Sequence, residues 1–188
     1  MPNSRKRLAG VFSPPTAPRE VREASEEDAP GIAAVHVRSW QVAYRGLVPD
    51  AVLAGLSVDG SERSWRRLVH ERGSTTLVAV GQRGIAGFCA ISTPSRDAGA
   101  AERTAEIAAI YVDPDHWRRG VGTALLVEAL ERLRRDGWEE VTLWTFAAND
   151  AARAFYAAHG FEPGGTERKN ETTGEPEVRL RRALRPRP

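Results

Sequence analysis

The chain has 188 residues, 41% of them hydrophobic, and is long enough to bury one hydrophobic core. Its 27 basic and 25 acidic residues leave a formal net charge of only +2, which argues against a nucleic-acid partner. No apolar run approaches the roughly 18 residues of a membrane-spanning helix, and one cysteine, Cys89, excludes an internal disulfide. We therefore expect a soluble, cytoplasmic protein with no membrane partner.

The N-terminal residues combine prolines with basic residues and lack the apolar stretch of a signal peptide. We predict a disordered tail over residues 1–18, followed by one domain over residues 19–188. Within that domain, the spacing of apolar residues alternates between the periods of helices and strands. The predicted strands are residues 19–24, 76–80, 85–92, 104–112, 139–146, 161–168 and 177–184, and the predicted helices are residues 26–45, 49–56, 58–72, 121–135 and 150–159.

The stretch from Ile110 to Leu126 is the most informative part of the chain. It passes from an apolar strand, through a polar turn, into a helix that begins at Gly120 and Gly122. The first N–H groups of a helix have no partner within it, and glycine lets an anion approach the backbone. Arg118 and Arg119 add two cations directly before the glycines. The stretch therefore predicts a phosphate or pyrophosphate site, although it matches neither a dinucleotide-binding fingerprint nor a P-loop.

A second block follows about one helix and one strand later, from Val141 to Phe161. Its strand leads to Asn149, a favourable N-cap, and to a helix that carries Phe155 and Tyr156 and ends before Gly160. By itself this block predicts an ordinary strand–helix unit with Phe155 in the core. The role of Tyr156 stays open at this level.

Together the two blocks resemble the GNAT superfamily of N-acetyltransferases. The resemblance rests on the segments 112–114 (Val-Asp-Pro) and 118–123 (Arg-Arg-Gly-Val-Gly-Thr), followed by Asn149, Phe155-Tyr156 and Gly160-Phe161. It covers about residues 75–184, and residues 35–50 also resemble a bacterial subgroup that mostly lacks a defined substrate. Trp117 departs from the family pattern, which has arginine or glutamine there. The implied α/β fold has a central, mixed, mostly antiparallel sheet with a splayed parallel pair, flanked by helices.

The resemblance implies an enzyme that transfers the acetyl group of acetyl-CoA, its co-substrate, to a primary amine of a small molecule or peptide in a ternary complex, without a metal. Its implied cofactor-binding residues are Ile110, Tyr111, Val112, Arg118, Arg119, Gly120, Val121, Gly122, Thr123, Asn149, Phe155 and Tyr156. The splay frees backbone groups of residues 110–112 for the pantetheine arm, and the amides of residues 118–123 meet the pyrophosphate. The alternative is a CoA-binding sensor or interaction module without transferase activity, and a homodimer stays open.

Acetyl transfer needs a deprotonated amine, a stabilised oxyanion and a leaving thiolate. Tyr156 matches the family tyrosine that protonates the CoA sulfur, and a backbone N–H of Val112 or Tyr111 is the expected oxyanion donor. Glu106 is a candidate base that acts through a water chain, but it is equally compatible with an ordinary strand-end carboxylate. His36 is a second candidate, and the amine can also arrive neutral.

The acceptor is the least defined part of the prediction. Trp40 and Tyr44 are spaced four residues apart on the first predicted helix, so they share one face. In such folds this helix borders the acceptor pocket, and aromatic walls suit an amine with an apolar body. Both residues are also compatible with plain core packing. The sequence does not distinguish an antibiotic, a polyamine, an amino acid or a protein N-terminus.

Overall fold

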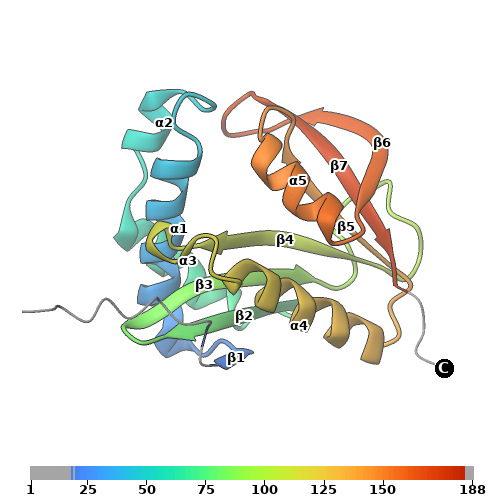
Figure 1. Cartoon of the computed structure of the whole chain (residues 1–188), viewed down its shortest axis with the longest axis horizontal. Helices are drawn as coiled ribbons and strands as arrows, with labels where there is room; N and C mark the ends of the chain where they lie inside the picture. Colours follow the sequence, from blue (N-terminus) through green and yellow to red (C-terminus); the bar gives the residue numbers. More distant parts are fainter. Residues whose placement is uncertain (1–17, 19, 185–188) are drawn as a thin grey trace, which may run out of the picture.

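The computed structural model describes residue 18 and residues 20–184, which form one seven-stranded sheet covered by helices on both faces (Figure 1). The strands are β1 (Glu20–Glu23), β2 (Ser74–Gly81), β3 (Gly84–Ser92), β4 (Thr104–Val112), β5 (Glu140–Phe146), β6 (Glu162–Lys169) and β7 (Pro176–Ala183). They lie in the order β1-β2-β3-β4-β5-β7-β6. Only the β4–β5 pair is parallel among these strands. The predicted disordered tail lies outside the described residues, apart from its last one.

Different helices pack on the two faces of the sheet. The helical segments are η1 (Glu26–Asp28), α1 (Ala29–Ala43), α2 (Asp50–Ala54), α3 (Val58–Leu68), η2 (Pro114–His116), α4 (Val121–Arg135) and α5 (Asp150–Ala158). Side chains of β2 alternate between the faces: Val78 packs with α1 and α3, whereas Leu77 packs with α4. Within residues 20–184, no helix combines the length and the apolar character that a bilayer crossing requires.

The predicted mixed α/β fold is confirmed, and the helix and strand bounds agree with prediction to within a few residues. The first predicted helix divides into η1 and α1, because Pro30 sits at the start of α1, where a missing N–H is tolerated. Cys89 is fully buried, and burial raises the pKa of its thiol to about 12. It is therefore a core residue, as predicted, and unsuited to act as a nucleophile.

The splay of the parallel pair is the feature that positions the site. Register between β4 and β5 runs from Thr104 opposite Glu140 to Ile107 opposite Leu143, and ends there. Both strands continue beyond this point, so their carboxyl-terminal ends diverge. Ala108, the next residue of β4, is exposed although it lies in the middle of the sheet. The divergence therefore opens the sheet at its centre, as predicted.

The backbone direction of β4 determines which groups face this gap. The Asp113 N–H donates to the Ala86 carbonyl at 2.9 Å, and Tyr111 lies opposite Phe88 on β3. Because backbone groups alternate in direction along a strand, Asp113 and Tyr111 face β3. Ile110 and Val112 consequently direct their N–H and C=O groups into the gap that β5 leaves.

Candidate active site

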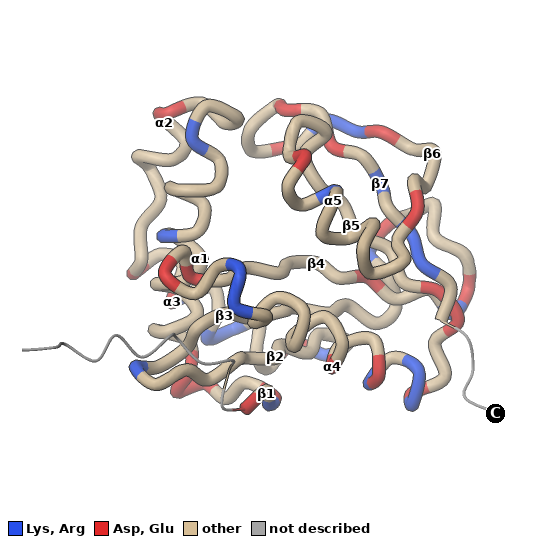
Figure 2. The backbone as a smooth tube through the Cα atoms, in the orientation of Figure 1, with Lys and Arg blue, Asp and Glu red and all other residues tan. Residues whose placement is uncertain are grey.

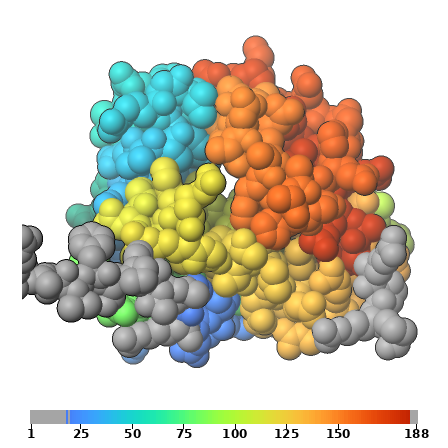
Figure 3. All heavy atoms as spheres, viewed as in Figure 1, coloured from blue at the N-terminus to red at the C-terminus, as the bar shows by residue number. Residues whose placement is uncertain are grey.

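A cavity of about 1000 Å³ occupies the gap between β4 and β5. Figure 3 shows the surface hollowed between the segment that leads into α4 and the helix α5. Two of the predicted site residues, Arg119 and the candidate base His36, do not line this cavity. The predicted residues that line it are Trp40, Tyr44, Glu106, Ile110, Tyr111, Val112, Arg118, Gly120, Val121, Gly122, Thr123, Asn149, Phe155 and Tyr156. Residues far apart in the sequence thus meet around one space.

The start of α4 forms one mouth of the cavity. Gly120 is the N-cap with φ +79°, a left-handed conformation that glycine adopts without strain, and Arg118 also has a positive φ of 59°. Among the described residues, no side chain caps this helix, so its first amides are free to bind an anion. Arg118 and Arg119 form the basic stretch just before α4 in Figure 2. The geometry fits the predicted pyrophosphate site.

Helix α5 forms the facing wall. The Asn149 side-chain oxygen accepts from the Ala152 N–H at 3.1 Å, which makes Asn149 the predicted N-cap. Phe155 reaches across to α4: a Cβ placed on Gly122 would lie 3.5 Å from the Phe155 ring. Glycine at position 122 thus leaves a small space beside the Phe155 ring that a Cβ would fill at ordinary van der Waals distance.

Tyr156 lies deep in the cavity wall. It is only 7% exposed, and its ring packs edge-on against Phe155 and Phe161 at centroid distances of 5.3 and 5.6 Å. Its hydroxyl has no hydrogen-bond partner among the described residues. Burial raises the pKa of the Tyr156 phenol above its ordinary value, with smaller contributions from Cys89 and Tyr111. The side chain is therefore a neutral donor with an unused O–H.

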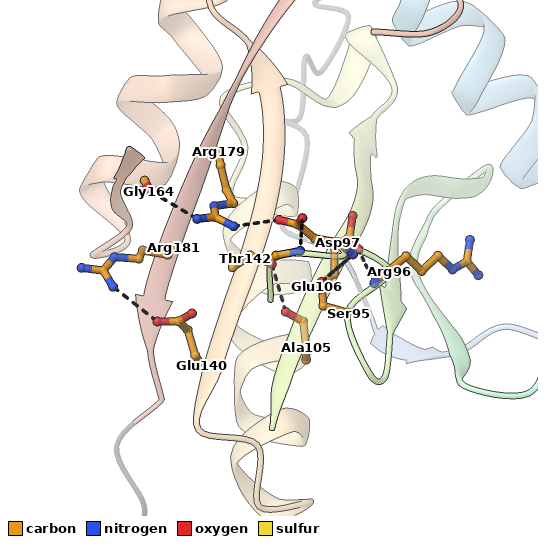
Figure 4. A network of polar contacts seen from close by, with 11 residues as sticks. Ser95, Arg96, Asp97, Ala105, Glu106, Glu140, Thr142, Gly164, Arg179 and Arg181 are labelled. Atoms are coloured by element: carbon orange, nitrogen blue, oxygen red, sulfur yellow. Dashed lines mark hydrogen bonds and ion pairs between the residues drawn. The ribbon is translucent and has the colours of Figure 1, made fainter. Parts of the chain in front are cut away.

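Glu106 is a buried carboxylate that also lines the cavity. One of its oxygens, Oε2, accepts from the Arg96 N–H at 2.9 Å and from the Ser95 hydroxyl at 3.3 Å (Figure 4). The neighbouring Asp97 carboxylate pairs with Arg179 on β7 at 2.9 Å. Glu106 therefore holds the β3–β4 loop in place, while its Oε1 atom has no partner among the described residues.

Trp40 and Tyr44 belong to a cluster of aromatic rings that joins α1 to β5 across the gap. Tyr44 and Phe146 meet edge-on at 4.9 Å, and Trp40 lies 4.9 Å from Tyr44 and 6.3 Å from Tyr111. Tyr44 is 9% exposed and packs with apolar residues of α2. Trp40 and Tyr44 thus pack in a core cluster and also line the cavity, and their part in acceptor binding stays a prediction.

His36, the second candidate base, does not line the cavity. Its Nδ1 atom accepts from the Trp65 indole N–H at 3.3 Å, and its ring stacks on Tyr111 at 5.3 Å. Burial lowers the pKa of His36 to about 4, so the imidazole stays neutral at physiological pH. We interpret His36 as a packing residue beneath the site.

The wall formed by β5, β6 and β7 contains residues that the sequence did not identify: Trp144, Arg168, Asn170 and Glu177. Glu177 is 7% exposed and accepts from Arg168 Nε at 2.7 Å and from Asn170 Nδ2 at 2.9 Å. The Arg168 guanidinium lies 4.2 Å from the centre of the Trp144 ring. Sequence alternation within β7 alone does not show that Glu177 faces the gap, because the register between β5 and β7 decides it.

Comparisons with known proteins agree with this geometry. The sequence model of the acetyltransferase (GNAT) family matches residues 38–161, which include both motifs. The uncharacterised N-acetyltransferase YuaI of Bacillus subtilis is 28% identical over 173 residues, covering 87% of this chain and 96% of that protein. A spermidine N(1)-acetyltransferase of Thermoplasma acidophilum is 22% identical over 153 residues, covering 79% of this chain and 91% of that protein.

Among solved structures, the PaiA N-acetyltransferase of Thermoplasma acidophilum in complex with coenzyme A shares the fold. Its TM-score is 0.73 at 19% identity, over 87% of this chain and 98% of that chain. The family match, the splayed strands and the cavity between α4 and α5 lead to the same identification. The chain belongs to the GNAT family and is an acetyl-CoA-dependent acyltransferase.

Proposed function

We propose that this enzyme transfers the acetyl group of acetyl-CoA directly to a primary amine of a small molecule or peptide, with both substrates bound at once. One observation carries the proposal: a single cavity extends from the start of α4 to Trp144 and Glu177 on the opposite side of the gap. The donor and the acceptor can therefore meet inside it. The buried thiol of Cys89, with its raised pKa, does not support an acyl-enzyme intermediate.

In this proposal the cofactor lies along the gap. Its pyrophosphate accepts from the free amides at the start of α4, and its pantetheine amides pair with the backbone groups of Ile110 and Val112. Such pairing gives partners to β4 backbone groups that β5 leaves open. Asn149 and Phe155 border the arm on the side of α5.

The transfer then follows from the groups around the thioester. The amine nitrogen attacks the carbonyl carbon, and the Val112 N–H stabilises the oxyanion, because the Tyr111 N–H faces β3. The C–S bond breaks, its electron pair goes to sulfur, and Tyr156 donates a proton to that sulfur. An ammonium loses one proton before it attacks, whereas an amine that arrives neutral needs no such step. In both cases the tetrahedral adduct then loses one proton from nitrogen, which leaves through water toward the free Oε1 atom of Glu106 and balances the proton that Tyr156 gives to sulfur.

A sensor that binds CoA without transferring its acyl group is the alternative. The unused Tyr156 hydroxyl and the cavity volume on the acceptor side favour transfer, since a sensor needs neither. Acceptor candidates are amines with an apolar body and, because of the spermidine enzyme among the relatives, polyamines. Peptide N-termini are a further class of candidate acceptor.

Thermal unfolding and a thiol assay test the proposal. Acetyl-CoA and CoA should raise the melting temperature, because any ligand of the native state does so, whereas NAD and ATP should do much less. The amines to be tried are an aryl-alkylamine, spermidine, amino acids and short peptides. At least one of them should raise the rate of thiol release above the rate of acetyl-CoA hydrolysis without amine. Equal stabilisation by NAD would refute the CoA site. CoA binding without amine-dependent release would favour the sensor.

A further inference from the structure

Trp117 makes a contact that the proposed function leaves unexplained. Its indole N–H donates to the Val112 carbonyl at 2.7 Å, a short and well-formed hydrogen bond. The side chain lines the cavity and is 39% exposed, which makes it one of few large apolar residues at the surface. An exposed tryptophan thus caps a backbone group inside the cofactor cavity.

The capped carbonyl belongs to the part of β4 that faces the gap. Asp113 and Tyr111 face β3, so Val112 directs its C=O away from β3, to the side that β5 has left. In the proposed complex this carbonyl is a partner for an amide N–H of the pantetheine arm. A carbonyl oxygen has two lone pairs, but the indole of Trp117 lies against this oxygen on the cavity side at 2.7 Å. The indole and the arm therefore compete for the same space beside the Val112 carbonyl.

We propose that Trp117 is a placeholder for the cofactor: its indole N–H occupies the Val112 carbonyl in the free enzyme and yields it to the pantetheine arm on binding. This inference rests on the proposed function. It extends that function, because it assigns Trp117 a part in the affinity and rate of cofactor binding.

The local backbone allows the ring to move without the loop. Arg38 of α1 forms ion pairs with Asp113 and Asp115, each at 2.9 Å. Asp113 Oδ1 also accepts a hydrogen bond from the Asp115 N–H, so these contacts hold the turn before Trp117 in place. After Trp117, Gly120 begins α4. The exposed indole can therefore rotate about its own side-chain torsions into solvent, while the pyrophosphate loop stays in place.

Displacement has a measurable consequence. Only molecules whose Val112 carbonyl is free bind the pantetheine arm, so the contact lowers the apparent affinity for CoA. A neutral intramolecular hydrogen bond has a modest net value, which corresponds to an effect of about two- to tenfold. Removing the indole donor should thus tighten CoA binding, the opposite of what loss of a direct binding residue does.

Calorimetric titration of the full chain with CoA and with adenosine 3′,5′-bisphosphate tests this. The second probe contains the nucleotide part of CoA and lacks the pantetheine arm. Trp117→Phe keeps an aromatic ring but cannot donate, so it should bind CoA about two- to tenfold more tightly and the bisphosphate unchanged. Trp138→Phe is the matched control, because Trp138 packs against the core and does not line the cavity, and it should change neither affinity.

Tryptophan fluorescence supplies a second readout. CoA should change the emission of the parent by an amount that Trp117→Phe loses, whereas the bisphosphate should leave that component unchanged. Equal or weaker CoA binding by Trp117→Phe would overturn the placeholder role, while CoA binding by the parent would still support the proposed function. Weaker binding of both probes would instead assign Trp117 a direct contact with the nucleotide. A parent that binds neither probe would refute both proposals.

Discussion

Replacing Tyr156 by phenylalanine separates a catalytic tyrosine from a packing one. The ring contacts with Phe155 and Phe161 are made by carbon atoms and remain in the variant. The hydroxyl has no protein partner among the described residues, so its removal breaks no hydrogen bond there. Tyr156 lines the cavity, where water can bond its hydroxyl, so the variant should be about as stable as the parent.

The expected effect lies in turnover. If Tyr156 protonates the leaving sulfur, its loss should lower kcat by about 10² to 10⁴, the usual range for a positioned general acid. The dissociation constant of acetyl-CoA should change little, because the pyrophosphate and the pantetheine arm keep their partners. Burial raises the pKa of this phenol, so its own ionisation should not lower the rate of the parent below about pH 10.

The assay is initial-rate thiol release with any accepted amine, accompanied by a thermal melt and a CoA titration of each protein. Lower kcat together with an unchanged melt and an unchanged CoA affinity would support the acid role. A kcat within a few-fold of the parent would refute it, whatever the melt shows, and would point to water as the proton source. Loss of all three properties would show that the ring itself is disturbed.

Further predictions concern the loop and a buried histidine. A Cβ at position 122 would lie 3.5 Å from Phe155, and the two methyl groups of Gly122→Val would extend further into the space between α4 and Phe155. CoA affinity should therefore fall at least about tenfold in a titration, and normal binding would exclude the proposed pyrophosphate site. Gly120→Ala should cost about 1–2 kcal/mol in urea unfolding, because φ is +79° there; an unchanged midpoint would contradict this. His36 has a folded pKa near 4, below its unfolded value of about 6.5, so the unfolded chain binds the proton more readily. Stability should be full above about pH 6.5 and fall by about 3 kcal/mol as pH drops through 4, and His36→Gln should flatten that slope.

The elements that carry the proposed cofactor residues could be predicted from the sequence because their signals are local. The bounds of β4 and α4 follow from apolar periodicity and from glycines at the turn, and Asn149 caps α5 as its side-chain chemistry predicts. Each of these features depends on residues that are close together in the sequence. Their meeting at one cavity follows from the parallel pairing of β4 with β5.

The arrangement of the proposed acceptor side could not be predicted in the same way. Glu177 faces the cavity because β7 pairs with β5 in one register, and a shift of one residue would turn it to the other face. Glu106 anchors the loop through the Arg96 amide, a contact that no pattern in the sequence marks. Even Trp117, five residues from Val112, shows its hydrogen bond only once the turn between them has a defined geometry.

In the proposed function, the choice of acceptor depends on the β6–β7 turn. Asn170 organises the β6–β7 turn, since its side-chain oxygen accepts from the Thr172 and Thr173 amides, and its side-chain nitrogen donates to Glu177. The turn and the buried carboxylate are therefore one unit, and β5 stands between that unit and β4 in the sheet. The amides of α4 and the open backbone of β4 lie on the other side of that strand. Changes in the turn should therefore reshape the acceptor end of the cavity while the CoA end keeps its partners.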